Sequence, residues 1–258
     1  MEDAELEGKI MEVARMIVNA RRVAALTGAG ISTESGIPDF RGPAGLWKRV
    51  DPSIATIDYF LENPDKYWEF HIGLVSSAMA ARPNAAHIAL AELESIGRLD
   101  CVITQNIDGL HQKAGNKNVI ELHGTLATDR CMGCGKRYSW EEVNKIIKDG
   151  GLPPRCPACG SIIRPDVVLF NEQLPAGALN KAFRCSMECD LMLVLGSSLT
   201  VMPAAYLPET AKSHGAKVII LNMEPTAMDY IADVIIFGKL GEVLPKIVSY
   251  VRKMVSKS

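Results

Sequence analysis

The stretch VAALTGAGISTESGIPDFRG, residues 23–42, decides the fold class of this chain. Its first four residues are apolar and continuous, which predicts a buried strand, and Gly28 and Gly30 follow soon after. A strand that ends in such a glycine turn is typical of the phosphate-binding corner of a dinucleotide site. However, Thr33 replaces the third glycine of that pattern, and a second turn cluster at 36–41 stands where a helix should continue. The stretch therefore predicts a nucleotide site of unusual form.

Apolar runs elsewhere in the chain extend this prediction to a whole sheet. Each is short, continuous and rich in β-branched residues, as in parallel strands buried on both faces, and they lie at 101–104, 119–122, 191–195, 217–221 and 234–237. Helical patterns separate several of them, for example at 84–96 and 204–213, and another precedes the first strand at 5–20. Such alternation predicts an α/β fold with a doubly wound, parallel, Rossmann-like sheet.

Two segments do not follow this alternation, and we expect them to form a smaller lobe. Residues 51–82 carry a helical pattern, and residues 126–164 are interrupted by Cys, Gly and Pro. The predicted division is a Rossmann-like nucleotide-binding domain made of residues 1–50, 83–125 and 165–258, with a helical insertion and a zinc-ribbon insertion.

Composition and charge restrict the class of protein. The chain has 258 residues, 48% of them hydrophobic, and a net charge of −2, so no global basic field favours nucleic acid. The acidic N-terminus lacks the apolar core of a signal peptide. The most apolar stretch, 191–207, is too short and too interrupted to span a bilayer. We expect a cytoplasmic, monomeric protein that binds neither membranes nor nucleic acid.

Four of the seven cysteines form two C-x-x-C pairs. The first pair is Cys131 and Cys134, the second is Cys156 and Cys159, and the gap at 135–155 is slightly longer than in the usual zinc ribbon. Four thiolates suit tetrahedral zinc and leave no open coordination position. We therefore expect one structural zinc rather than a catalytic one.

Glycine and polar residues follow five of the expected strands. In open α/β sheets, ligands bind beyond the carboxyl ends of the strands. Here these ends carry residues 28–30, 105–108, 123–124, 196–198 and 222. Any turn favours such residue types, but five strand ends together predict one ligand site. Glycine N–H groups would approach a phosphate there, and Arg41 would add a positive charge.

Among the five histidines, His123 is the best candidate for a general base. It follows an apolar run at the same sheet edge, and the intrinsic pKa of imidazole suits proton transfer near neutral pH. Asn106 and Asp108 could hydrogen-bond a carboxamide or sugar hydroxyls, or merely cap the following helix. The acidic residue that holds the adenine ribose in dehydrogenases is not evident, so we do not expect a hydride carrier.

Together these motifs resemble the sirtuins, a family of NAD-dependent protein deacylases. The resemblance rests on GAGIS, GIPDFRG, TQNIDGLH, ELHG, the two C-x-x-C pairs and GSSLTV, which occur in the family's order. It implies that NAD is a consumed co-substrate. The residues implied to bind NAD are Gly28, Ala29, Gly30, Thr33, Asp39, Phe40, Arg41, Gln105, Asn106, Ile107, Asp108, Gly196, Ser197, Ser198, Asn222 and Leu240.

The implied reaction converts acetyl-lysine, NAD and water into lysine, nicotinamide and 2′-O-acetyl-ADP-ribose. His123, Asn106 and Asp108 are the implied catalytic residues, with His123 taking a proton from a ribose hydroxyl. An acetylated protein segment would add as an extended strand between residues 170–174 and 199–202. Its implied contacts are Val168, Phe170, Asn171 and Val201.

The chain departs from the family pattern at Asn171, where sirtuins usually have glycine. Sirtuins that remove acidic acyl groups have a Tyr-x-x-Arg pair in the helical insertion, and His71 and Leu74 stand at those positions here. A succinyl carboxylate would lack its arginine partner, so we expect deacetylation over desuccinylation. Two other functions are open: a mono-ADP-ribosyltransferase with the same NAD site, and a zinc-ribbon protein that binds nucleic acid and senses a nucleotide.

Overall fold

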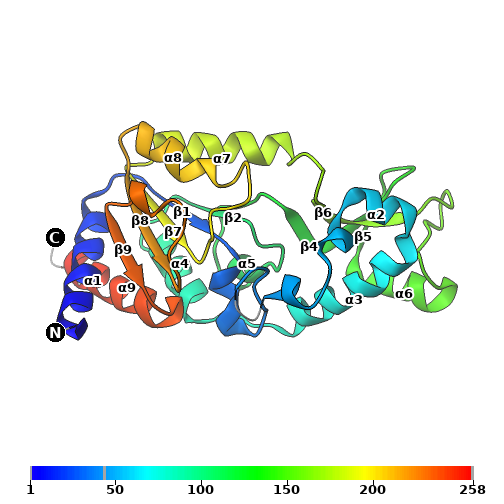
Figure 1. Ribbon diagram of the computed structural model, residues 1–258, viewed down its shortest axis with the longest axis horizontal. Coiled ribbons are helices and arrows are strands. Elements are labelled where there is room, and N and C mark those ends of the chain that lie inside the picture. The colour runs from blue at the N-terminus through cyan, green and yellow to red at the C-terminus, as the bar shows by residue number, and fades with distance from the viewer. Residues whose placement is uncertain (1, 43–44, 257–258) are drawn as a thin grey trace.

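The larger part of the computed structural model, which describes residues 2–42 and 45–256, is a six-stranded sheet (Figure 1). Its order is β3-β2-β1-β7-β8-β9, and every neighbouring pair is parallel. The strands are β1 Val23–Thr27, β2 Cys101–Thr104, β3 Val119–Glu121, β7 Leu191–Leu195, β8 Lys217–Asn222 and β9 Val234–Phe237. The predicted doubly wound parallel sheet is confirmed.

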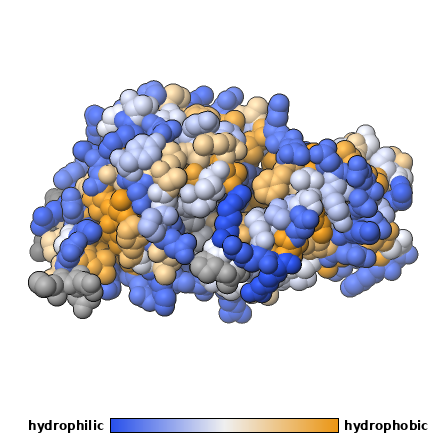
Figure 2. Space-filling model, in the orientation of Figure 1, coloured by the Kyte–Doolittle hydropathy of each residue, from blue (hydrophilic) through white to orange (hydrophobic). Residues whose placement is uncertain are grey.

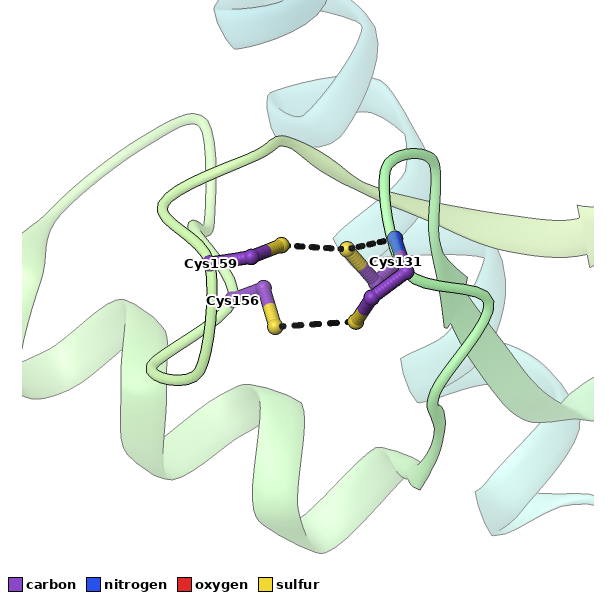
Figure 3. A group of neighbouring side chains, drawn as sticks. Cys131, Cys156 and Cys159 are labelled. Atoms are coloured by element: carbon purple, nitrogen blue, oxygen red, sulfur yellow. Dashed lines mark hydrogen bonds between the residues drawn. The ribbon is translucent and has the colours of Figure 1, made fainter.

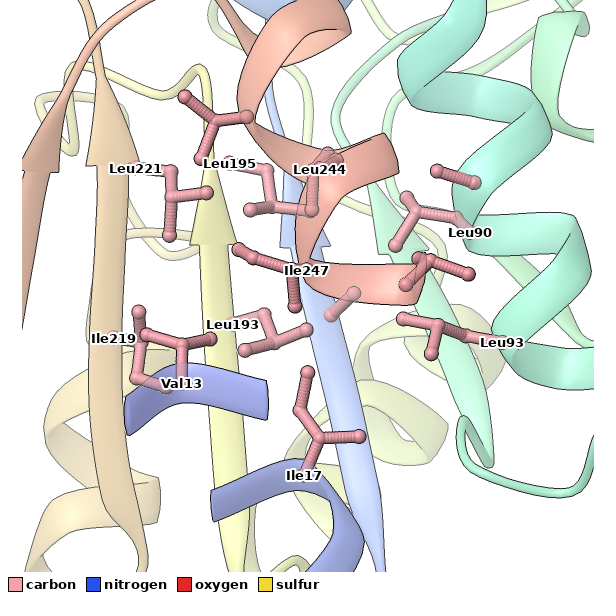
Figure 4. Close-up of a cluster of buried hydrophobic side chains, with 14 of the residues drawn as sticks. Val13, Ile17, Leu90, Leu93, Leu193, Leu195, Ile219, Leu221, Leu244 and Ile247 are labelled. Carbon is pink, nitrogen blue, oxygen red and sulfur yellow. The ribbon is translucent and has the colours of Figure 1, made fainter. Parts of the chain in front are cut away.

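Helices bury both faces of this sheet. The helices α1 Glu2–Asn19, α4 Ala85–Ser95 and α9 Leu240–Val255 cover one face, and α7 Ala176–Glu188 and α8 Tyr206–Ser213 cover the other (Figure 1). Side chains alternate along a strand, so Val23 and Ala25 enter the first cluster, shown in Figure 4, while Ala24 and Leu26 enter the second. This explains why the strands have continuous apolar sequences.

The chain leaves β1 and β7 at the point where the strand order reverses. The loops that follow these two strands lie against each other, since the Gly28 N–H donates to Leu195 O at 3.0 Å and the Gly30 N–H donates to Gly196 O at 2.9 Å. After β1 the chain forms a 3₁₀ helix, Ala29–Ser35, which ends at Gly36 with φ of 85°. The α-helix usual after this strand is therefore replaced, in agreement with the unusual sequence at 31–41.

A second, three-stranded antiparallel sheet builds the smaller lobe at the right of Figure 1. It has the order β5-β4-β6, with β4 Gly124–Cys131, β5 Arg137–Ser139 and β6 Ile163–Val167. The helices α2 Ile57–Glu62, α3 Pro64–Ala80 and α6 Trp140–Gly150 lie at the same end of the molecule. The smaller elements are α5 Leu110–Ala114 and the 3₁₀ helices Leu46–Lys48, Pro52–Ala55 and Asp229–Ile231.

The helical segment and the ribbon share one apolar cluster. Phe60, Tyr67 and Trp68 pack with Tyr138 and Ile163 in it, and Trp68 Nε1 donates to Ile163 O at 3.0 Å. The two segments predicted as insertions therefore complete a single core, as expected for a smaller lobe. The exact division at residues 50, 82, 125 and 164 stays a prediction.

The molecular surface is mainly polar on the face shown in Figure 2, with hydrophobic residues in separate groups. Within residues 2–42 and 45–256, no helix is both long and apolar enough to cross a bilayer.

Candidate active site and metal centre

A cavity of ≈ 900 Å³ runs along the carboxyl ends of the parallel strands and on toward the smaller lobe. It is lined by all but one of the residues predicted to bind NAD or peptide: Gly28, Ala29, Gly30, Thr33, Asp39, Phe40, Arg41, Gln105, Asn106, Ile107, His123, Val168, Phe170, Asn171, Gly196, Ser197, Ser198, Val201, Asn222 and Leu240. Residues distant in sequence thus meet in one cavity at the topological switch point.

The glycines at this switch point are required by close backbone contact. A Cβ on Gly28 or Gly30 would lie 2.7 Å from Gly196 O, and one on Gly196 would lie 2.5 Å from Ile31 N. Gly196 also has φ of +63°, which favours glycine. Larger residues would separate the loops after β1 and β7 and so deform the cavity floor.

The residues after β2 form hydrogen bonds to the loops after β1 and β7. Asn106 is 7% exposed, and its Nδ2 donates to Gly28 O and to Ser32 Oγ, each at 3.1 Å. Gln105 Nε2 donates to Ser197 Oγ at 2.8 Å. These bonds fix the relative positions of the loops after β1, β2 and β7.

Asp108 is the one predicted residue that does not line the cavity. Its Oδ2 accepts a hydrogen bond from Ser32 Oγ at 2.7 Å, and its Oδ1 accepts one from the Leu110 N–H at 2.9 Å. The carboxylate therefore accepts from the first N–H of α5, whose N-cap residue is Gly109, and holds the loop after β1. This is close to the helix-capping role that the sequence left open.

His123 presents one ring nitrogen to the cavity. Its Nδ1 lies 2.9 Å from Gln105 O, and because a carbonyl oxygen only accepts, Nδ1 carries the proton of the neutral ring. Nε2 is then left with a lone pair. Burial lowers the pKa of His123 below 6.5, the hydrogen bond to Gln105 O opposes this, and the positive charge of Arg41 lowers it further. The ring is therefore neutral at pH 7 and can accept a proton.

Three aromatic side chains form a wall of the same cavity. The rings of Phe40 and Trp47 stack with centroids 5.3 Å apart, and the ring centroids of Trp47 and Phe170 are 6.1 Å apart. Trp47 Nε1 is buried without a hydrogen-bonding partner among the residues that the structure describes. This wall joins the loop at 36–41 to the segment predicted to contact the peptide.

The segment predicted to bind peptide is attached to the helical part of the smaller lobe. The Phe170 N–H donates to Ala55 O at 2.9 Å, and Phe170 O accepts from the Ile57 N–H at 3.0 Å. Asn171 has φ of 70°, and its Nδ2 donates to Asp58 Oδ2 at 2.9 Å. Asparagine tolerates this left-handed conformation better than most residues, which explains why it can replace glycine here.

Four cysteine side chains meet at the end of the ribbon (Figure 3). Sγ of Cys131 lies 3.4 Å from Sγ of Cys159, Sγ of Cys134 lies 3.7 Å from Sγ of Cys156, and all four sulfurs lie within 4.8 Å of one another. Tetrahedral zinc with Zn–S bonds of about 2.3 Å separates its ligands by about 3.8 Å. The four cysteines therefore fit one zinc ion with no position left for a substrate.

The other histidines lie outside the cavity lining. His71, His87 and His111 are buried, and His214 is exposed at the end of α8. His111 Nε2 lies 2.9 Å from Thr27 Oγ1 beneath the glycine loop. These four histidines therefore occupy packing or surface positions, which leaves His123 as the histidine of the cavity.

Sequence reasoning missed part of the cavity wall. The additional lining residues include Glu34, Trp47, Tyr67, Phe70, Glu224 and Lys239. The aromatic members have no signal of their own in the sequence, because the same residue types build the core. Glu224 lies two residues after Asn222, the last residue of β8, so its place near a strand end was a usable signal.

Fold and site together define an α/β protein with a nucleotide-type glycine corner and a four-cysteine ribbon. The model of the Sir2 family matches residues 28–203. NAD-dependent protein deacetylase 1 of Pyrobaculum aerophilum is 50% identical over 94% of this chain and 95% of its own length. The chain therefore belongs to the Sir2 family, and the resemblance to sirtuins is confirmed.

Solved structures of the family agree with this assignment. One Sir2 enzyme structure is 48% identical, has a TM-score of 0.89 and covers 96% of this chain and 99% of that chain. Another, described as Sir2 with a p53 peptide and NAD⁺, is 41% identical, has a TM-score of 0.84 and covers 95% and 97% of the two chains.

Proposed function

We propose that this protein is an NAD-dependent protein-lysine deacetylase that consumes NAD and water and releases lysine, nicotinamide and 2′-O-acetyl-ADP-ribose. One observation carries the proposal: the strand-end residues, His123 and the segment 168–171 line a single continuous cavity. A nucleotide and an acyl-lysine side chain can therefore meet at a neutral imidazole. The related deacetylase and the Sir2 structure with NAD⁺ and peptide support the same chemistry.

NAD would lie along the strand ends. The backbone of residues 28–30 and 196–198 would hold the phosphates, and Asn222 and Leu240 would contact the adenosine half. Asn106 and Ile107 would contact the nicotinamide ribose and carboxamide. Asp108 would act from behind the wall, because its carboxylate bonds Ser32 and Leu110 rather than facing the cavity.

The reaction needs one base at the ribose. The acyl oxygen attacks the ribose carbon bearing nicotinamide, and the bond to nicotinamide breaks. His123 Nε2 then takes a proton from a ribose hydroxyl, and the freed oxygen attacks the former amide carbon. Water completes release of the lysine amine. A positioned base of this kind contributes roughly 10²–10⁴-fold in rate, and the aromatic wall would keep other water away from the reacting carbon.

The acetylated protein segment would bind as an added strand beside residues 170–174 and 199–202, with Val168, Phe170, Asn171 and Val201 as contacts. The N–H and C=O groups of Phe170 already bond Ala55 and Ile57, so main-chain pairing with the peptide would begin beyond Phe170. Main-chain pairing gives affinity with little demand on sequence.

Cys131, Cys134, Cys156 and Cys159 would hold a structural zinc ion, which when bound cross-links the two loops of the ribbon. We also propose that the protein acts as a monomer in the cytoplasm, where free thiols of this kind remain reduced. Size-exclusion chromatography with light scattering tests the monomer, since a dimer mass would contradict it.

Mass spectrometry of one reaction tests the proposal: purified protein and an acetyl-lysine peptide, with and without NAD. Nicotinamide and O-acetyl-ADP-ribose that form together, only with both substrates, would support deacetylation. Nicotinamide with ADP-ribose attached to protein and an unchanged peptide would instead identify a mono-ADP-ribosyltransferase. No cleavage of NAD would overturn both, and salt-dependent DNA binding would then favour the nucleic-acid-binding alternative.

A further inference from the structure

A second cavity lies on the β5-β4-β6 sheet and has a volume of ≈ 380 Å³, within the range of small-molecule sites. We call it the arginine pocket and define it by four of its lining residues, Thr128, Arg130, Arg137 and Asp166. Val168 lines both this pocket and the larger cavity, so the two cavities share a wall.

Three arginines occupy one row across this sheet. Arg137 on β5 is the register partner of Arg130 on β4, and Arg130 is the register partner of Arg164 on β6. Like charges directly opposite each other destabilise a sheet. Such a row therefore needs negative groups to offset it.

The charge of Arg164 is already offset inside the lobe. Its Nη1 donates to Glu172 Oε1 and its Nη2 donates to Glu172 Oε2, each at 2.6 Å. This bidentate pair occupies both carboxylate oxygens of Glu172, which also lines the pocket, so Glu172 acts on Arg130 only through its charge and not through a direct ion pair.

Asp166 is shared by the remaining two arginines. Its Oδ1 lies 3.3 Å from Arg130 Nε, its Oδ2 lies 3.9 Å from Arg137 Nε, and Thr128 Oγ1 donates to Oδ2 at 2.9 Å. Two guanidinium groups thus share one carboxylate as their direct ion-pair partner. Among the residues that the structure describes, the Nη atoms of Arg130 and Arg137 have no hydrogen-bonding partner.

We propose that the arginine pocket binds a small free oxyanion of the phosphate or carboxylate class. Guanidinium groups recognise both anions through paired N–H donors. Asp166 lies on the Nε side of both guanidinium groups, at 3.3 Å from Arg130 and 3.9 Å from Arg137, while their Nη atoms stay available. The anion supplies the negative charge that the row of arginines lacks. The concave volume suits a free ion or small molecule.

Calorimetric titration of the zinc-loaded protein, saturated with ADP-ribose so that the larger cavity is filled, tests this site. The two probes are inorganic phosphate and succinate, each at ionic strength held constant with sodium chloride. We expect saturable binding of at least one probe, and phosphate alone or succinate alone would identify its class.

The matched variants are Arg137→Gln in the pocket and Arg184→Gln on exposed α7. The side chain of Arg137 is 72% exposed, so its replacement does not disturb the core. We expect Arg137→Gln to raise the dissociation constant about tenfold or more, as for the loss of charge-assisted hydrogen bonds, and Arg184→Gln to leave it unchanged. No saturable binding of either probe, or the same constant in Arg137→Gln, would overturn the proposal. Neither outcome bears on deacetylation.

Discussion

Acidification from pH 7 to pH 5 is expected to destabilise this protein through three buried histidines. Burial is the main cause that lowers the pKa of His71 and His111 to about 3 and that of His87 to about 4. A group with a lowered folded-state pKa binds fewer protons in the folded than in the unfolded chain. Its contribution to stability is therefore complete above the unfolded pKa, near 6.5, and is lost as the pH falls toward the folded value.

The size of the effect follows from these values. Each histidine costs about 2 kcal/mol between pH 7 and pH 5 when its unfolded pKa is about 6.5, so the three together cost about 5 to 6 kcal/mol. Asp129 acts in the opposite direction, because burial and, second, the charge of Asp166 raise its pKa to about 7. Its protonation returns about 2 kcal/mol over the same interval. The net loss from these four groups is about 3 kcal/mol.

His71→Phe isolates one of these contributions. The ring packs with centroids 5.8 Å from Tyr67 and 5.1 Å from Trp68, and its Nδ1 has no partner among the described residues, so Phe keeps the packing and removes an unpaired polar atom. Urea unfolding of the zinc-saturated protein should show that the variant loses about 2 kcal/mol less than the wild type between pH 7 and pH 5. The control is His214→Gln at the exposed end of α8. An unchanged pH dependence in His71→Phe would refute the reasoning.

Three further outcomes are expected. His123→Ala should lower kcat/KM for an acetyl-lysine peptide by about 10²-fold or more, with little change in Tm. In the wild type, the acidic limb of the pH profile of kcat/KM should have an apparent pKa below 6.5, because burial lowers the pKa of His123. An apparent pKa above 6.5, or a fully active variant, would contradict the assignment of His123 as the base. Cys134→Ser should abolish stoichiometric zinc binding, measured by elemental analysis. It should also lower Tm by several degrees, since the ribbon shares its core with Phe60 and Tyr67. Full zinc content in the variant would show that the four sulfurs are not the zinc ligands. Acetyl-lysine peptide should be turned over faster than succinyl-lysine peptide. Leu74→Arg, which places a guanidinium in the cavity wall, should raise the ratio of kcat/KM for the succinyl peptide to that for the acetyl peptide about tenfold. Faster desuccinylation by the wild type would show that the missing arginine does not set the acyl preference.

The strands were predictable because burial on both faces leaves a strong pattern. β2, β7 and β9 have the predicted bounds, and β8 differs by one residue. Polar residues at the carboxyl ends were equally visible, since a parallel sheet brings every such end to one edge. Local sequence and topology together therefore located the cavity floor.

The walls of the cavity could not be predicted in the same way. Tyr67 and Phe70 lie on α3, whose apolar residues also form the core of the smaller lobe, so their sequence pattern does not separate lining from packing. Asp108 shows that a position after a strand end does not by itself place a side chain in the cavity. Its sequence position matches the cavity residues Gln105 and Asn106, but its side chain turns away to Ser32 and Leu110.

The departure from the dinucleotide pattern at Thr33 has a structural consequence for catalysis. In a dehydrogenase the third glycine lets a helix pack closely after the first strand. Here Thr33 Oγ1 instead donates to Gly30 O at 2.9 Å, and the 3₁₀ helix ends at Gly36. The chain then returns to line the cavity with Phe40 and Arg41. A helix in this place would carry those residues away from the site. Replacing it brings Arg41 close enough to lower the pKa of His123, and a neutral imidazole is the form that can take a proton from a ribose hydroxyl once nicotinamide has left.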